Sequence, residues 1–339
     1  MADTGILPDH HLAALLGRGI LTADAPLAEG QVQPASIDLR LGREAWRLRA
    51  SFLPGPERTV AERLDDDLVM HTVDLRAGAV LETGCVYLAP LQEGLKLPAG
   101  LSAAMNPKSS TGRIDVFTRV ITDRGVAFDQ APVGYDGPLY AEISPCTFSV
   151  LAREGDRLSQ VRFRQGEHRT LREVTVSVDL AGFGDGIVGY RARRHSGLVD
   201  LAKIGGHAAS RFWEPLHAPD RRLILDPGEF YILASQEAVE IGRGEAAEMA
   251  PIATEIGEFR AHYAGFFDPG FGTAEAGGIG ARAVLEVRGR DVPFILEHGQ
   301  PIARLVYEPM LAMPETAYGQ VASNYQAQSL KLSKFFTSE

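Results

Sequence analysis

An internal repeat limits what this chain of 339 residues can fold into more than any other feature of its sequence. The segment 81–88 aligns with the segment 225–232, and Gly84 falls on Gly228 at an offset of 228 − 84 = 144 residues. Three further pairs lie at the same offset: Pro107 and Pro251, Glu142 and Glu286, Gly155 and Gly299. Matches in four separate segments at one offset are not expected by chance. The sequence therefore predicts two copies of one domain in tandem.

Short β-like segments fill both copies. Segments such as 36–41 and 84–89 alternate apolar and polar residues or carry β-branched and aromatic ones, and Gly, Pro and Asp separate them. A short helical pattern covers residues 9–18, but long amphipathic helical patterns are scarce. We predict a mainly β protein built of small barrels or sandwiches.

The length is sufficient for two domains of ordinary size. Hydrophobic residues make up 45% of the chain and charged residues 23%, a composition typical of a globular protein. The join is expected in the Gly- and Arg-rich region 182–196. We therefore predict a first domain over residues 1–190 and a second over residues 191–339.

The net charge of −10 argues against a surface that binds duplex nucleic acid nonspecifically, because such a surface needs clustered Lys and Arg. The two cysteines, Cys85 and Cys146, are too few for a disulfide framework or a metal cluster. No signal peptide and no apolar run of membrane-spanning length is apparent. We expect a soluble cytoplasmic protein whose partners are neither nucleic acid nor membrane.

A polar segment of the first copy has a composition suited to phosphate oxygens. Lys108, Ser109 and Ser110 precede Gly112 and Arg113, so a cation and two hydroxyls are followed by a residue that clamps oxygens bidentately. By itself this segment could also be an ordinary polar turn. At the constant offset, the second copy has other residues at four of these positions: Ala253, Thr254, Ile256 and Gly257. Only the first copy is thus expected to hold phosphate.

A carboxylate lies inside an apolar strand pattern in each copy, at Glu142 and at Glu286. Such a residue could be a glutamate at the strand edge that faces solvent. Its recurrence in both copies, after a turn that contains Asp, favours a functional role instead. Burial beside a bound base raises the pKa of a carboxyl group, which can then take a proton from water and deliver it to a leaving amine.

The sequence has no ligand set for catalytic zinc. Zinc deaminases need H-x-E and P-C-x-x-C spacing, whereas Pro145-Cys146 has no second cysteine two residues on and the histidines are scattered. We predict a route without a protein-bound metal, in which a glutamate, a serine hydroxyl and a backbone carbonyl orient the water.

Four segments in this order resemble the motifs of the dUTPase and dCTP deaminase superfamily: 106–113, 128–137, 139–143 and 155–163. The segment 35–42 (Ala-Ser-Ile-Asp-Leu-Arg-Leu-Gly) and the helix before it are similar to the N-terminal part of dCTP deaminases, most of which are about half this length. The resemblance implies two dUTPase-like domains of the β-clip type, each a distorted β-barrel.

The resemblance also implies roles for individual residues. In the family a serine and an arginine assist a glutamate, which carries over to Ser109, Arg113 and Glu142, with Glu286 as the repeat equivalent. If like copies meet across an interface between chains, this serine and arginine face Glu142, and if first and second copies alternate, they face Glu286. We prefer Glu142, because its copy holds every element except an uninterrupted hairpin. The residues expected to bind the substrate include the hairpin aspartates that contact deoxyribose and a C-terminal tail that closes over the triphosphate, although this tail could also be a disordered terminus. They are Lys108, Ser110, Asp129, Gln160, Asp268, Tyr325, Gln328 and Lys331.

The implied activity is hydrolysis of dCTP to dUTP and ammonia, with Mg²⁺ bound by the triphosphate and no zinc. The dUTP would supply thymidylate synthesis. Family sites lie between subunits, so we expect a homo-oligomer. One alternative is a dUTPase-type pyrophosphatase or a bifunctional enzyme, although Tyr135-Asp136 reverses the usual Asp-Tyr order of dUTPases. The other is a noncatalytic nucleotide-binding relic.

Overall fold

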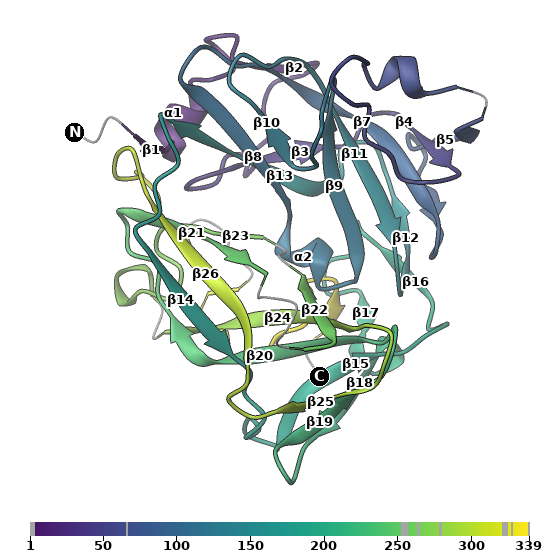
Figure 1. Ribbon diagram of the computed structural model, residues 1–339, viewed down its shortest axis with the longest axis vertical. Coiled ribbons are helices and arrows are strands. Elements are labelled where there is room, and N and C mark those ends of the chain that lie inside the picture. The colour runs from purple at the N-terminus through teal and green to yellow at the C-terminus, as the bar shows by residue number, and fades with distance from the viewer. Residues whose placement is uncertain are drawn as a thin grey trace.

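The computed structural model describes residues 4–65, 67–251, 257–262, 265–277, 280–320, 325–326 and 328–337. It is mainly β, which confirms the predicted class. Figure 1 shows β1 to β13 in the upper part of the molecule and most of β14 to β26 below them, with helix α2 where the two groups meet. The helices are all short: α1 (Asp9–Ala13), η1 (Ala61–Arg63), α2 (Ser109–Gly112), α3 (Ala209–Phe212) and η3 (Ala274–Ala276).

The first group of strands, called the first half below, forms two larger sheets. One has the order β1-β13-β8-β10, with β3 paired to β13, and the other has the order β5-β4-β7-β11-β9, with β2 paired to β7. Their apolar side chains, such as Leu39, Val161 and Phe163, are completely buried in a common core. The strands of the first sheet are β1 (Gly5–Ile6), β3 (Ile37–Arg40), β8 (Leu101–Pro107), β10 (Gln130–Ala131) and β13 (Arg157–Gln165). Those of the second are β2 (Leu21–Ala23), β4 (Glu44–Leu48), β5 (Val69–Asp74), β7 (Val86–Lys96), β9 (Val116–Thr122) and β11 (Asp136–Pro145).

The second half also has two larger sheets, ordered β14-β26-β21-β23 and β18-β15-β20-β24-β22. Strand β14 lies before residue 190 and β15 crosses it, yet they pair with β26 and β20. By strand pairing, the second half therefore begins earlier than the predicted boundary. The strands are β14 (Arg172–Ser177), β15 (Ile187–Ala192), β18 (Trp213–His217), β20 (Phe230–Val239), β21 (Glu245–Ala250), β22 (Phe259–His262), β23 (Phe266–Phe267), β24 (Ala281–Gly289) and β26 (Pro301–Pro309).

Three small sheets complete the fold. In the first half, β6 and β12 pair with each other and β16 adds a parallel strand, while β19 with β25 and β17 with β27 form two-stranded ribbons. The bounds are β6 (Ala79–Leu81), β12 (Ser149–Ala152), β16 (Leu198–Asp200), β17 (His207–Ala208), β19 (Arg222–Leu225), β25 (Phe294–Glu297) and β27 (Phe336–Thr337).

Equivalent strands of the two halves pair in the same register. Glu142 lies opposite Leu88 where β11 pairs with β7, and Glu286 lies opposite Ile232 where β24 pairs with β20. The offsets are 286 − 142 = 144 and 232 − 88 = 144. The pairing of β13 with β8 and that of β26 with β21 show the same offset, through Val161 opposite Met105 and Leu305 opposite Met249. In both of these strand pairings, the opposed residues of the second half thus follow those of the first half by 144 positions.

One tight turn explains part of the sequence similarity between the halves. Gly84 and Gly228 have φ angles of 73° and 70°, which favour glycine because a side chain there is strained. Two residues before Gly84, the N–H of Glu82 donates to the Tyr87 hydroxyl at 3.1 Å. At the offset of 144, the N–H of Asp226 donates to the Tyr231 hydroxyl at 2.8 Å. The turn therefore requires both a glycine and a tyrosine at fixed spacing.

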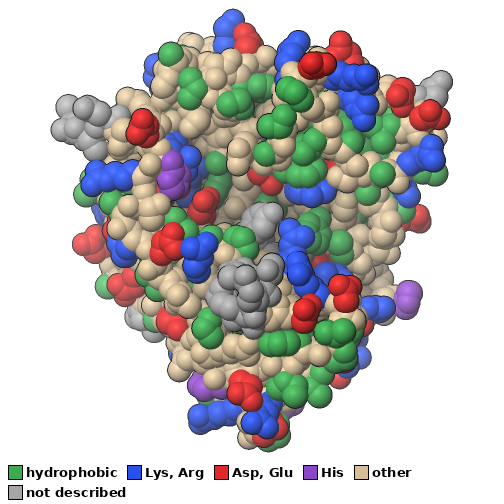
Figure 2. Space-filling model, viewed as in Figure 1, with side chains coloured by type: hydrophobic (Ala, Val, Ile, Leu, Met, Phe, Trp, Pro, Cys, Tyr) green, Lys and Arg blue, Asp and Glu red, His purple; other side chains and the backbone are tan. Residues whose placement is uncertain are grey.

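The surface carries charged side chains of both signs. Lys and Arg side chains on the face shown in Figure 2 are interspersed with Asp and Glu. Within the described ranges, no helix is long and apolar enough to cross a membrane. Cys85 and Cys146 are both free and half-buried.

Candidate active site between the halves

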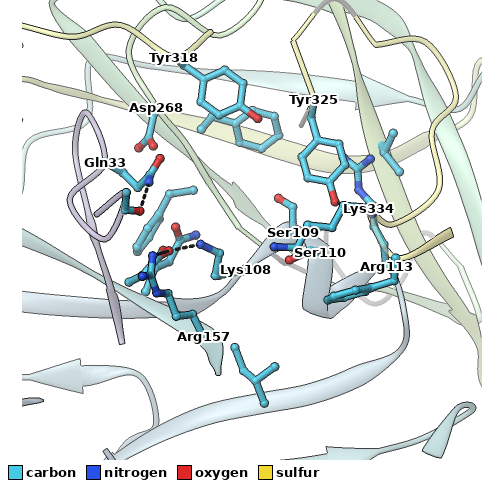
Figure 3. A pocket seen from close by; sticks show the side chains of 18 of the residues that line it. Gln33, Lys108, Ser109, Ser110, Arg113, Arg157, Asp268, Tyr318, Tyr325 and Lys334 are labelled. Atoms are coloured by element: carbon cyan, nitrogen blue, oxygen red, sulfur yellow. Dashed lines mark hydrogen bonds and ion pairs between the residues drawn. The ribbon is translucent and has the colours of Figure 1, made fainter. Parts of the chain in front are cut away.

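A pocket of about 430 Å³ lies between the two halves, and we call it the interhalf pocket. The first half contributes α2 and the beginning of β13, and the second half contributes β23, the turn after it and β24. From the C-terminal segment, Tyr325, Gln328, Lys334 and Phe335 provide a further wall. In Figure 3, Ser109, Tyr325 and Lys334 lie near one another, and Tyr318 and Asp268 lie on another side of the pocket.

The predicted phosphate segment forms α2 and touches the second half directly. The Asn106 side-chain oxygen accepts the N–H of Gly265 at 2.9 Å. Gly265 has φ +94°, and a Cβ on it would lie 2.2 Å from the Ser109 hydroxyl oxygen. Only glycine therefore allows the two backbones to approach this closely. This contact places Ser109 and Ser110 beside the turn of the second half.

Arg113 is buried at the end of α2 and is held by the C-terminal segment. Its Nη1 donates to the Gln328 side-chain oxygen at 3.0 Å and to the Lys331 carbonyl oxygen at 2.9 Å. Its guanidinium carbon lies 3.9 Å from the centre of the Tyr325 ring, a cation–π contact. The guanidinium therefore has a fixed orientation.

Glu286 lies on β24 and lines the pocket with only 3% of its surface exposed. Burial raises the pKa of Glu286 well above its ordinary value, and the charge of Arg113 only partly offsets this effect. Its Oε2 has no hydrogen-bond partner among the described residues. A buried polar atom without a partner is costly, so this oxygen is suited to a hydrogen bond with a bound molecule.

Asp268 follows β23 and faces a cation from the other half. Its Oδ1 accepts a hydrogen bond from Arg162 at 3.1 Å, and both side chains are buried. Burial raises the pKa of Asp268, whereas the charge of Arg162 lowers it. Asp268 lines the interhalf pocket near Tyr318.

Three cations gather at one end of the pocket. Lys108 and Arg157 both form ion pairs with Asp38, and the Arg157 Nη1 lies 3.7 Å from the Asp38 Oδ2. The other oxygen of Asp38, Oδ1, has no hydrogen-bond partner among the described residues. Lys334 is the third cation, and burial followed by the neighbouring charge of Lys108 lowers its pKa. Cations held close together and partly desolvated form a favourable environment for an anion.

Residues 333–337 are anchored to the rest of the protein. Beyond the described wall of the pocket, β27 pairs with β17, and Phe336 packs against Phe148 and Trp213. The Ser333 hydroxyl donates to the Ser110 carbonyl oxygen at 2.7 Å. The first residues of the predicted tail motif, 323–324, lie outside the described residues.

The structure brings most of the predicted site residues to this one pocket. Its lining includes Ser109, Arg113 and Glu286 among the predicted catalytic residues. It also includes six of the predicted substrate-binding residues: Lys108, Ser110, Gln160, Asp268, Tyr325 and Gln328. Lys331 participates through its carbonyl oxygen, while its side chain is exposed. Glu142 and Asp129 are not part of the lining.

Within the chain, α2 faces Glu286 rather than Glu142. The preference for Glu142 assumes that like copies meet across an interface between chains, and it stays a prediction. Glu142 is buried on β11 opposite Arg119 of β9, whose Nε donates to it at 3.1 Å. The guanidinium of Arg119 also lies 3.8 Å from the centre of the Phe128 ring. The Oε1 of Glu142 is therefore held in an ion pair inside the first half, while its Oε2, like that of Glu286, has no hydrogen-bond partner among the described residues.

The expected match between Asp129 and Asp268 also fails in the structure. β10 pairs with β8 as β23 pairs with β21, and at this register Ala131 corresponds to Phe267. The residue after Ala131 is Pro132, whereas the residue after Phe267 is Asp268. The first half thus has no carboxylate at this place, because its hairpin differs in length before the strand. Asp129 instead accepts the N–H of Val120 at 2.7 Å.

Sequence reasoning missed several residues of the pocket. Arg157 lies within the quoted motif 155–163, and its basic side chain was a usable signal. Asp38 likewise lies in the quoted segment 35–42. Tyr318 and Lys334 carried no such signal, because they come from segments far from these motifs in the chain. Among the described residues, no group of three or more His, Cys, Asp and Glu could hold a metal ion.

Comparison with known proteins shows the family of this chain. Residues 3–167 match the family model described as the 2'-deoxycytidine 5'-triphosphate deaminase N-terminal domain, and residues 152–336 match the C-terminal domain of the same family. The crystal structure of 2'-deoxycytidine 5'-triphosphate deaminase from Agrobacterium tumefaciens is 54% identical and superposes with a TM-score of 0.88, covering 91% of this chain and 100% of that one.

Two curated relatives match about half of the chain. A dCTP deaminase of Natronomonas pharaonis is 32% identical over 167 residues, which is 47% of this chain and 80% of that protein. A protein named "dCTP deaminase, dUMP-forming" from Methanosphaera stadtmanae is 27% identical over 47% of this chain and 78% of its own length. With two family models that together span most of its length, this chain belongs to the dCTP deaminase family.

Proposed function

We propose that this protein hydrolyses dCTP to dUTP and ammonia in the interhalf pocket. The observation that carries the proposal is the buried carboxyl group of Glu286, with a free Oε2, beside Arg113 and α2. A volume of about 430 Å³ is in the range of small-molecule sites. The family to which the chain belongs supports the same reaction.

The triphosphate binds at the cationic end of the pocket. Its oxygens are attracted by three cations, Lys108, Arg157 and Lys334. The hydroxyls of Ser109 and Ser110 are further donors, since both residues belong to α2 and line the same pocket. Mg²⁺ enters as the counter-ion of the nucleotide, so it belongs to the substrate. Burial and then the charge of Lys108 lower the pKa of Lys334, and a bound polyanion offsets both effects.

The base lies against Glu286. The carboxylate takes a proton from water, and the resulting hydroxide adds to C4 of the cytosine ring. Glu286 passes this proton to N3 of the ring, then takes the proton of the new hydroxyl at C4 and delivers it to the amino group. The amino group leaves as ammonia, so that one water is consumed and a carbonyl oxygen is left at C4. The positive charge of Arg113 favours the ionised form of Glu286, because it opposes the effect of burial on the pKa of this carboxyl group.

One chain supplies both sides of this pocket, whereas the family resemblance implies sites between subunits. The shared register of the strand pairs supports two dUTPase-like copies related by an internal repeat. We still expect a homo-oligomer, which light scattering at micromolar concentration tests. A fully active monomer would contradict this expectation.

The decisive experiment measures all products of dCTP turnover with Mg²⁺ present. Ammonia and dUTP in equal amounts, without pyrophosphate, are the expected result. Some relatives are named dUMP-forming, so pyrophosphate in step with ammonia would show that dUTP is hydrolysed further. Pyrophosphate from dUTP without any ammonia from dCTP would indicate a dUTPase, and no turnover with intact binding would indicate a relic.

A further inference from the structure

Arg162 is a wholly buried cation of the first half that reaches into the second half. It lies on β13, and only 2% of its side chain is exposed. At the repeat offset, 162 + 144 = 306, the second half has the apolar Val306. An arginine at this depth needs partners for its N–H groups, and the apolar counterpart shows that strand packing alone does not require it.

Most of its partners belong to the second half's hairpin. Arg162 donates to the Phe267 carbonyl oxygen at 3.3 Å, to the Asp268 Oδ1 at 3.1 Å and to the Ala247 carbonyl oxygen at 3.1 Å. Its guanidinium carbon also lies 4.0 Å from the centre of the Phe266 ring. One guanidinium therefore contacts three consecutive residues, Phe266 to Asp268, and all three line the interhalf pocket.

Arg164, two residues along the same strand, is a natural comparison. It also reaches the second half, where its Nε and Nη2 each donate to Glu308 at 2.7 Å. Neither Arg164 nor Glu308 is among the described residues that line the interhalf pocket. Arg164 thus joins the halves without touching the site, while Arg162 does both.

We propose that Arg162 is a positioning residue, whose guanidinium holds Phe266, Phe267 and Asp268 in the conformation that recognises the sugar of the nucleotide. The proposal rests on the proposed function and extends it to the selection of deoxyribose over ribose. The guanidinium also donates to the Ala35 carbonyl oxygen of the first half at 3.4 Å. A planar fork that donates to a carboxylate and to three carbonyl oxygens at once fixes the hairpin in a way that a single ammonium group does not. A small shift of the hairpin would leave room for a 2'-hydroxyl.

The test compares Arg162→Lys with the matched variant Arg164→Lys. For Arg162→Lys we expect a KM for dCTP about tenfold higher or more, as for the loss of hydrogen bonds to a charged group. Its preference for dCTP over CTP in kcat/KM should fall by a similar factor, while kcat changes little. Arg164→Lys should leave KM and the preference unchanged, even if its melting temperature falls. Equal effects of both variants on KM and preference, or no kinetic effect of Arg162→Lys, would overturn the proposal.

Calorimetric titration of the full chain with dCTP and with CTP separates this proposal from the proposed function. If the wild-type protein binds dCTP more tightly than CTP but releases no ammonia, only the deaminase assignment fails, and the variants are compared by Kd. If the wild type does not discriminate between the two nucleotides, the role of Arg162 is refuted directly. Should Arg162→Lys not fold, Arg162→Gln takes its place, because its amide keeps a neutral donor; an unchanged preference in that variant refutes the proposal as well.

Discussion

Glu142 and Glu286 occupy the same register of equivalent strand pairs, yet their surroundings are opposite. In the first half, Arg119 of the neighbouring strand lies against Glu142 and stacks on Phe128. In the second half, the Glu286 carboxyl group faces a pocket, and its nearest compensating charge, Arg113, comes from the other half of the chain. The comparison teaches that a glutamate in a strand becomes a structural ion pair or a reactive group according to what the facing segment supplies.

The largest expected effect separates the two glutamates directly. Glu286→Gln keeps the shape of the side chain but removes the proton acceptor, so kcat for ammonia release should fall about a thousandfold, within the range known for general acid–base groups. Glu142→Gln is the matched control and should leave kcat within a few-fold. The contrast between the two glutamates would be refuted if Glu142→Gln were the inactive variant. Equal losses of kcat in both variants would mean two interdependent sites.

The two arginines that face these glutamates should also differ. Arg113→Ala removes the charge beside Glu286 and two hydrogen bonds to the C-terminal segment, so we expect kcat/KM to fall by about a hundredfold, as for the loss of a preorganised charged donor. Arg119→Ala leaves Glu142 buried without its partner. This variant should lower the thermal midpoint while kcat/KM stays near the wild-type value. Full activity of Arg113→Ala would contradict the assignment of the site.

A smaller effect is expected from the cations at the phosphate end. Lys334→Met should raise the KM for dCTP about tenfold with little change in kcat, because it removes one charge-assisted contact that ground state and transition state share. Lys331→Met is the control, since this exposed residue contributes its carbonyl oxygen to the site. The reverse ranking of the two variants would show that the tail binds the triphosphate through Lys331 instead.

The smallest expected effect is on the stability of the protein and its dependence on pH, through a buried carboxyl group of the first half. Burial raises the pKa of Asp129 to about 7, well above its ordinary value of 3.8. Between these values the folded protein keeps a proton that the unfolded chain has released, so stability falls as the pH rises, by up to roughly 1.4 kcal/mol per pH unit from this group. Asp129→Asn retains an acceptor for the Val120 N–H and should flatten the dependence of the unfolding free energy between about pH 4 and 7.

Chemical denaturation at several pH values measures this dependence. The control is Asp136→Asn, which changes an exposed carboxylate on β11 and should leave the slope as it is. An unchanged slope in Asp129→Asn would mean that this carboxyl group is ionised in the folded protein. Asp115, whose pKa burial raises to about 6, remains in both variants and contributes in the same direction.

Local features of the site were predictable from the sequence because they depend on neighbours in the chain. The segment 108–113 requires no long-range information to show a cation, hydroxyls and an arginine on one turn. The glutamates are equally visible, as polar residues within apolar strand patterns. Alignment by residue type was misleading for Asp129, because the strand register that corresponds to Asp268 places Pro132 there.

By itself, the sequence determined the mainly β class, the offset of 144 residues and the set of side chains with suitable chemistry. These follow from periodicity, turn residues and composition, which act over a few residues at a time. Only the tertiary structure decided which glutamate meets α2. Arg113 and Glu286 are separated by 286 − 113 = 173 residues, and their meeting depends on contacts across the halves such as the close approach of Gly265 to Ser109. Packing between distant segments is set by the combined shape and charge of both surfaces, and no short stretch of sequence contains that information.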